Sequence, residues 1–288
     1  MRGVIQIPRT RPPAVAGLFY PHDPLKLRAV LDDCSARAVR PEATPSAARR
    51  ARTSTPKALI APHAGYVYSG PIAASAYRAL DDAAHGIERV VLIGPSHFVR
   101  FSGLAVSRAA AFETPLGAVP VDDSMRREIL RLPHVMAADF PHAREHSLEA
   151  QLPFLQVLLG EFRVLPIATG DATAREVATA LKCIWGDEET LIIVSTDLSH
   201  YLRYEAARGV DAATAQAILA CSTELNCEQA CGCVGINGLM QVAAERALEV
   251  RLLDLRNSGD TTAERSRVVG YGAFALYETR AMNIPART

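Results

Sequence analysis

The stretch KALIAPH, residues Lys57–His63, decides the fold class of this chain. Residues Lys57–Pro62 form an almost continuous apolar run that ends in a proline, and the imidazole of His63 follows it. The pattern returns in Arg89–Pro95 (RVVLIGP) and in Thr190–Thr196 (TLIIVST). Near-continuous runs of Val, Ile and Leu are typical of strands that are covered on both faces. These runs therefore predict an α/β fold with a central sheet between layers of helices.

The rest of the chain extends this alternation of strands and helices. Further strands are predicted at Phe162–Ile167, Val250–Leu255 and Arg267–Tyr277. A first helix is expected after Asp23, which is a good capping residue, with Pro24 at the first helical position. The other predicted helices are Pro71–Leu80, Asp122–Leu132, Ser147–Leu159, Ala172–Ile184, Glu205–Ala220 and Gly232–Ala247.

We expect residues 1–288 to form one domain with a mostly parallel or mixed sheet and helices on both faces. Two domains are possible on length, but no convincing linker separates the halves of the chain. Residues 36–56 are rich in Ala, Arg, Pro, Ser and Thr and lack apolar periodicity. This segment is predicted to be a flexible loop rather than a basic recognition arm.

Composition excludes several classes of protein. The 31 Lys and Arg residues balance the 31 Asp and Glu residues, so the charge gives no reason to expect binding to nucleic acid or to an anionic membrane. No apolar run approaches the ~20 residues of a membrane-spanning helix, and residues 1–21 lack the apolar centre of a secretory signal. Six cysteines are too sparse for a disulfide scaffold. We therefore expect a cytoplasmic protein.

Chemistry-bearing side chains follow three of the predicted strands. His63 and His97 each come directly after an apolar run, and Asp197 and His200 follow a third. In open α/β sheets, functional sites lie beyond the carboxyl ends of the strands. Imidazole is the commonest ligand for transition metals, although a single histidine is more often a surface residue and Asp197 alone would be a helix cap. The positions match ligands from separate strands of one sheet and no zinc-finger spacing.

Cys231 is the candidate for a third ligand. It precedes a predicted helix, whose dipole would stabilise a thiolate. A metal ligand, a nucleophile and a small buried apolar residue all remain open for it. Cys231 and Cys233 flank one glycine, which is not the spacing of a redox or zinc-ribbon pair. The remaining cysteines are expected to be small buried side chains: Cys34, Cys183, Cys221 and Cys227.

The segment His142-Ala-Arg-Glu145-His146 fits the H-x-x-E-H pattern of inverted zinc peptidases. That chemistry needs both histidines on one face of a continuous helix. A zinc hydrolase using His142 and His146 is therefore an alternative hypothesis. The preferred interpretation is that Glu145 and His146 begin the following helix and border the pocket.

Five motifs together resemble the Memo family. They occur in the family's order: Arg11–Pro21 (RPPAVAGLFYP), Pro62–Gly70 (PHAGYVYSG), Gly94–His97 (GPSH), Glu145–Glu149 (EHSLE) and Asp197–His200 (DLSH). The resemblance as a whole runs from about Arg11 to Tyr277, which is nearly the whole chain. The bacterial branch of this family is called the AmmeMemoRadiSam system protein B.

The resemblance implies a fold similar to the class III (LigB-like) extradiol dioxygenases. It implies that His63, His97 and Cys231 are metal ligands and that Asp197 and His200 are an acid/base pair. Those dioxygenases hold iron with two histidines and a carboxylate, so a thiolate in the third position would change the chemistry. Iron or copper is the implied cofactor, with zinc less favoured. An AMMECR-type protein and a radical SAM protein are implied partners.

The leading hypothesis is a mononuclear transition-metal site with redox or oxygenase-like activity on an unknown small molecule or peptide. The side chains expected around the ligands are Glu145, His146, Tyr66, Tyr68 and Arg203. The alternative from another class is a peptide- or protein-binding module that uses the same pocket without catalysis.

Overall fold

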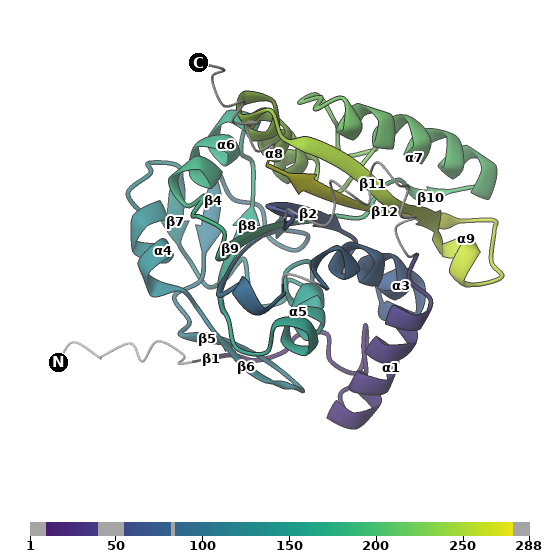
Figure 1. Cartoon of the computed structure of the whole chain (residues 1–288), viewed down its shortest axis with the longest axis horizontal. Coiled ribbons are helices and arrows are strands. Elements are labelled where there is room, and N and C mark those ends of the chain that lie inside the picture. The colour runs from purple at the N-terminus through teal and green to yellow at the C-terminus, as the bar shows by residue number, and fades with distance from the viewer. Residues whose placement is uncertain (1–9, 40–54, 82–83, 279–288) are drawn as a thin grey trace, which may run out of the picture.

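The computed structural model describes residues 10–39, 55–81 and 84–278 (Figure 1). Within these residues the main sheet has nine strands in the order β10-β12-β2-β9-β3-β8-β4-β7, with β11 paired to β12. The four central strands are parallel. They are β2 (Ala58–Ala61), β9 (Thr190–Ser195), β3 (Arg89–Pro95) and β8 (Arg163–Thr169). On either side, β12 runs antiparallel to β2 and β4 runs antiparallel to β8. The sheet is therefore mixed, with a parallel centre.

The central strands are buried on both faces because successive side chains point to opposite sides of a sheet. In β3, Val90 and Leu92 belong to one hydrophobic core, whereas Val91 and Ile93 belong to the other. All four are fully buried. This two-sided burial explains why the sequence shows continuous apolar runs here instead of an apolar/polar alternation.

Helices cover the two faces of the sheet separately (Figure 1). One face carries α1 (Pro24–Ala36), α3 (Tyr66–Tyr77) and α5 (Leu152–Leu159). The other carries α4 (Asp123–Ile129), α6 (Ala174–Cys183), α7 (Tyr204–Leu219) and α8 (Cys233–Arg246). The predicted α/β class with helices on both faces is thus confirmed.

Shorter elements complete the chain. The outer strands of the main sheet are β4 (Leu104–Val106), β7 (Val135–Ala137), β10 (His200–Leu202), β11 (Glu249–Asn257) and β12 (Val268–Tyr277). A separate three-stranded sheet joins β1 (Thr10–Arg11), β5 (Ala111–Thr114) and β6 (Gly117–Pro120). The short helices are η1 (Arg78–Leu80), η2 (Ala84–Gly86), η3 (Glu149–Gln151) and α9 (Ser258–Thr261).

The helix predicted from Pro71 begins earlier, at Tyr66. Proline favours the first turn of a helix because it has no N–H to donate, but here Pro71 lies inside the helix. Most of α3 is buried against the sheet and α1, so packing outweighs one missing backbone hydrogen bond. The loop predicted over 36–56 falls mainly on residues 40–54, which lie outside the described residues, and Ala36 is the last residue of α1.

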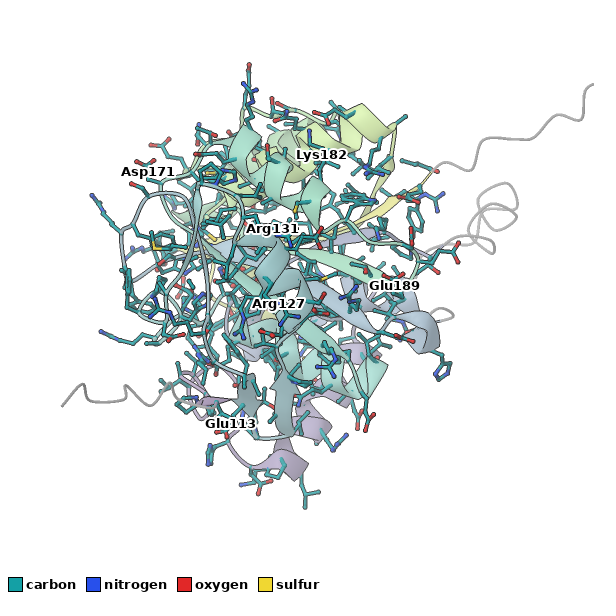
Figure 2. The ribbon with its side chains drawn as sticks, turned by 90° about the vertical axis from the view of Figure 1, so that its left-hand side faces the viewer. Glu113, Arg127, Arg131, Asp171, Lys182 and Glu189 are labelled. Carbon is teal, nitrogen blue, oxygen red and sulfur yellow. The ribbon has the colours of Figure 1, made fainter. Side chains whose placement is uncertain are left out.

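Figure 2 locates the two ends of the parallel strands. Asp171, which follows β8, and Glu189, which precedes β9, lie at opposite sides of that view. The side of Asp171 is therefore the carboxyl edge of the sheet. Across the part of the chain that the structure describes, every helix is too short or too polar to span a bilayer.

Candidate metal centre

His63 and His97 meet at the carboxyl edge of the parallel strands. His63 stands two residues beyond the end of β2, and His97 stands two residues beyond the end of β3. Between these strands lies β9, which ends at Ser195 and leads to Asp197. The centroids of the two imidazole rings are 5.2 Å apart. Strand ends far apart in the sequence thus converge as the apolar runs predicted.

His146 completes a group of three imidazoles. Its ring centroid lies 5.4 Å from that of His63 and 4.6 Å from that of His97. One nitrogen of each of the three rings lies within 4.8 Å of the others. Among the described residues, this is the group of His, Cys, Asp and Glu side chains that could hold a metal ion.

The carboxylate of Glu145 orients His97. Glu145 Oε1 lies 2.9 Å from Nδ1 of His97, and its Oε2 accepts the backbone N–H of His97 at 2.6 Å. The backbone N–H groups of His146 and Ser147 also donate to Oε1. Burial would raise the pKa of Glu145, but the hydrogen bonds from His97 and these N–H groups outweigh it and lower the pKa to about 2. An ionised Glu145 accepts a hydrogen bond from Nδ1–H, which leaves the Nε2 lone pair of His97 free.

A neutral chain of hydrogen bonds orients His63. Ser195 Oγ donates to the carbonyl of Ser147 at 2.6 Å and accepts from the Gln151 amide at 2.7 Å. Because its only proton is used, Ser195 Oγ acts as acceptor toward His63 Nδ1, which lies 2.9 Å away. The hydroxyl of Tyr77 in turn donates to Gln151 Oε1 and fixes the orientation of the amide. His63 is therefore also protonated at Nδ1, with Nε2 available as a ligand.

Burial keeps two of the imidazoles neutral. It lowers the pKa of His63 well below its ordinary value, and the neighbouring histidines lower it further. Burial also lowers the pKa of His146 to about 4, against the opposing effect of Glu145. Neutral imidazoles are the form that binds a metal ion. The site is thus ready for a cation without prior loss of protons from these rings.

Cys231 lies beside His63. Its Sγ is 3.4 Å from Nε2 of His63 and accepts the backbone N–H of Asp197 at 3.3 Å. Gly232 allows this approach, since a Cβ there would lie 2.7 Å from Thr196 Cβ and 2.9 Å from the Ser195 carbonyl oxygen. Burial raises the pKa of the Cys231 thiol to about 12, so it would bind a metal only by losing its proton to the cation's field.

Asp197 is the second buried carboxyl group of the centre, in addition to Glu145. Its Oδ1 accepts the backbone N–H of His63 at 2.8 Å, and its Oδ2 lies 4.0 Å from Nε2 of His63. Burial raises the pKa of Asp197 to about 7, against the hydrogen bond from His63. His200 lies half-buried at the start of β10, and burial lowers its pKa. A carboxyl group that exchanges a proton near neutral pH is suited to general acid/base work.

The two tyrosines and Arg203 differ in their exposure to solvent. Tyr66 is buried in the core and donates its hydroxyl to the Ala150 carbonyl at 2.7 Å. Tyr68, on the exposed side of α3, is 44% exposed. Arg203 is exposed at the N-terminus of α7.

The helical zinc motif is not formed. In the described residues, 139–148 contain turns and bends instead of a helix, so the expected helix start at Ser147 also shifts to η3 at Glu149. His142 lies in the core, where its Nε2 is 3.1 Å from the Ala105 carbonyl and its ring packs against Phe112. Burial lowers its pKa to about 4. The two histidines of the motif thus do not share a helix face, while His146 joins His63 and His97.

Glu145, which orients His97, was expected near the ligands, but sequence reasoning missed the residues that orient His63. Ser195 and Gln151 had no assigned role, although a serine at the end of an apolar strand and a glutamine in an apolar helix are visible signals. Phe19, whose ring centroid lies 4.8 Å from that of His146, was missed too. Its segment is anchored by Glu149. This carboxylate accepts hydrogen bonds from the N–H groups of Ala14 and Val15 and from the Tyr20 hydroxyl, and it forms an ion pair with Arg11.

Three comparisons place these observations among known proteins. A family model described as Memo-like protein matches residues 11–275. A MEMO1 family protein of Methanopyrus kandleri is 38% identical over 282 residues, which cover 92% of this chain and 98% of that protein. One from Aquifex aeolicus is 34% identical over 279 residues, covering 91% and 97%. Among solved structures, an uncharacterized protein from Escherichia coli K12 covers 75% of this chain and 98% of its own, with a TM-score of 0.48 and 11% identity.

Proposed function

The chain belongs to the Memo family, and we propose that it is a metalloprotein that binds one transition-metal ion between the ends of β2 and β3. The observation that carries this proposal is the group of three imidazoles with nitrogen atoms within 4.8 Å of one another. The rings of His63 and His146 are kept neutral by burial, and Nδ1 of His63 and of His97 has a hydrogen-bond partner, which favours a metal ligand role over a surface role.

His63 and His97 are the proposed central ligands, and His146 offers a third nitrogen. Cys231 is the proposed sulfur donor because its Sγ already lies 3.4 Å from Nε2 of His63. A thiolate beside imidazoles shifts the metal preference toward copper or zinc and would change the redox properties of bound iron. We propose iron or copper as the cofactor, as the resemblance to the Memo family implies, with zinc less favoured.

The protein's own groups would supply proton transfer and exclusion of water. Asp197 is held by its Oδ1 and directs Oδ2 toward the imidazoles, where it can hold or release a proton. His200 is the proposed second acid/base group. A bound ion would supply Lewis acidity and an electron-transfer site for a small-molecule or peptide substrate. Redox or oxygenase-like activity, as implied by similarity to the extradiol dioxygenases, is the proposed reaction class, and an AMMECR-type and a radical SAM protein are the proposed partners.

Peptide binding without catalysis is the second candidate, and Phe98 favours it. This ring is 49% exposed beside His97, its centroid lies 5.9 Å from that of His146, and the Arg144 guanidinium lies 4.9 Å above it. An exposed aromatic ring with a cation at the edge of a site is suited to hold a peptide side chain. Binding of a defined peptide that survives chelation of the metal would favour this function over the redox one.

Elemental analysis of the protein purified without oxygen tests the proposal. We expect iron or copper at close to one equivalent, with an absorption band from the metal–thiolate bond. The Cys231→Ser variant is expected to lose that band and to retain the imidazole ligands. A protein that stays free of transition metal after incubation with ferrous or cuprous ions would contradict the proposal.

A further inference from the structure

Two cysteines outside the proposed ligand set lie in contact. The Sγ atoms of Cys227 and Cys233 are 3.1 Å apart, although six positions separate the residues in the chain. Cys227 is exposed, whereas Cys233 is buried as the first residue of α8. The expectation that Cys227 is a small buried side chain is therefore wrong, since the turn before α8 carries it to the surface. Cys34 is buried as expected, and Cys183 and Cys221 are partly buried.

The backbone around this pair is fixed at both ends. Leu225 donates its N–H to Asn237 Oδ1 of α8 at 3.0 Å, and Asn237 Nδ2 donates back to the Leu225 carbonyl at 2.8 Å. At the other end, Cys231 donates its N–H to the Asp197 carbonyl at 3.2 Å. A disulfide needs an S–S distance of about 2.05 Å, so an approach of about 1 Å would join the two sulfur atoms.

We propose that Cys227 and Cys233 form a reversible disulfide that takes up peroxide ahead of Cys231. Three observations support this order of reaction. The exposed thiol is Cys227, the thiol in contact with it is Cys233, and the Cys231 sulfur is turned toward His63 and the Asp197 N–H. In a reducing compartment, a disulfide of this kind is transient and serves in redox sensing or protection.

The reaction consumes one peroxide for each pair. The Cys227 thiolate attacks a peroxide oxygen and the O–O bond breaks, which leaves a sulfenic acid on Cys227 and releases water after protonation. The Cys233 sulfur then attacks the Cys227 sulfur, the S–O bond breaks, and the departing hydroxide leaves as water with the Cys233 proton. Two thiols are oxidised and one peroxide becomes two waters. Two molecules of a thiol such as glutathione reverse the step and leave as their disulfide.

Peptide mapping of the full-length protein after mild hydrogen peroxide treatment tests the proposal. Cleavage after glutamate separates Cys227, in the peptide 225–228, from Cys231 and Cys233, in the peptide 229–245. We expect these two peptides to become cross-linked and to separate again on reduction. Four of the six thiols should remain titratable in the denatured protein.

Serine variants identify the partner of Cys227. The cross-link should persist in Cys231→Ser and be lost in Cys233→Ser. Because Cys233 is buried and its variant can lose stability, Cys227→Ser at the exposed position provides the second test and should also lose the cross-link. A link that survives in Cys233→Ser but is lost in Cys231→Ser would overturn the proposal. So would six remaining thiols, or a sulfinic acid on Cys227 without any cross-link.

Discussion

The ends of β2 and β3 hold their histidines in the same tautomer by different means. His63, with a side chain 1% exposed, is held by the neutral hydroxyl of Ser195. His97, with a side chain 28% exposed, is held by the ionised carboxylate of Glu145. Where water is excluded, a neutral acceptor is sufficient and introduces no buried charge. Where water competes for Nδ1–H, a charge-assisted hydrogen bond is needed, and such bonds are roughly twice as strong as neutral ones.

The largest loss of metal affinity is expected for the Glu145→Gln variant. The ionised carboxylate of Glu145 holds His97 by its Nδ1–H and makes His97 a more basic ligand. The variant removes this charge. Loss of a partner of this kind costs about 10- to 100-fold in metal affinity, and we expect a value near the upper end because the backbone N–H of His97 loses its acceptor as well. Competition with a metal-binding dye measures the change.

Glu149→Gln is the matched control for that variant. Glu149 is also a buried carboxylate with two backbone N–H donors, but it anchors the segment of Arg11 and Tyr20. Because Phe19 of that segment packs against His146, the control is expected to lower thermal stability and to weaken metal binding much less than Glu145→Gln does. Equal affinities for the two variants would mean that Glu145 does not act through His97.

A smaller loss is expected for Ser195→Ala, which removes the neutral acceptor of His63 Nδ1–H. Burial still limits the motion of the ring, so metal affinity should fall by about 10-fold, the lower end of the range for such partners. The Ser75→Ala variant controls for loss of stability, because Ser75 is a buried serine whose hydroxyl lies 2.7 Å from Asp254 Oδ2 and 3.0 Å from the Pro71 carbonyl oxygen. If Ser195→Ala lost more metal affinity than Glu145→Gln, the neutral acceptor of His63 would matter more than the charged acceptor of His97, contrary to this account.

The next expected effect concerns the stability of the fold rather than metal affinity, at Asp211, whose pKa is raised mainly by burial. Its donor is the backbone N–H of Ser199, and burial raises its pKa to about 6. Between about pH 4 and 6 Asp211 therefore binds more protons in the native state than in the unfolded state, so its contribution to the free energy of unfolding falls as pH rises and levels off above pH 6. Asp211→Asn should remove this slope, which is on the order of 1 kcal/mol per pH unit. Urea denaturation from pH 4 to pH 7 measures it, and an unchanged slope would contradict the role of burial.

The parallel centre of the sheet could be predicted from sequence because burial on both faces leaves a strong local signal. Arg89–Pro95 matches β3 residue for residue, and Thr190–Thr196 differs from β9 only by its last residue. The short strands β4 and β7 were missed, since three residues paired at the sheet edge give too little periodicity. Their position depends on pairing with β8 and with each other, which is tertiary information.

The position of the candidate centre was predictable, but the support around it was not. His63 and His97 come directly after strands, and strand ends meet at one edge. Glu145 and His146 were expected only as bordering residues because 139–148 has no regular structure that a pattern could reveal. Its backbone is held by three bonds that exist only once β3 and β9 are in place: the His97 N–H donates to Glu145, Ser147 Oγ donates to the Pro95 carbonyl, and Ser195 Oγ donates to the Ser147 carbonyl.

Anaerobic titration with cobalt(II), followed by visible absorption, tests the convergence of the two strand ends most directly. The wild-type protein and His85→Ala, which removes an exposed imidazole from η2, should bind a single equivalent with ligand-field and thiolate bands. The variant carrying both His63→Ala and His97→Ala should bind no tight equivalent. Undiminished binding with the same spectrum in the double variant would contradict a metal centre between β2 and β3.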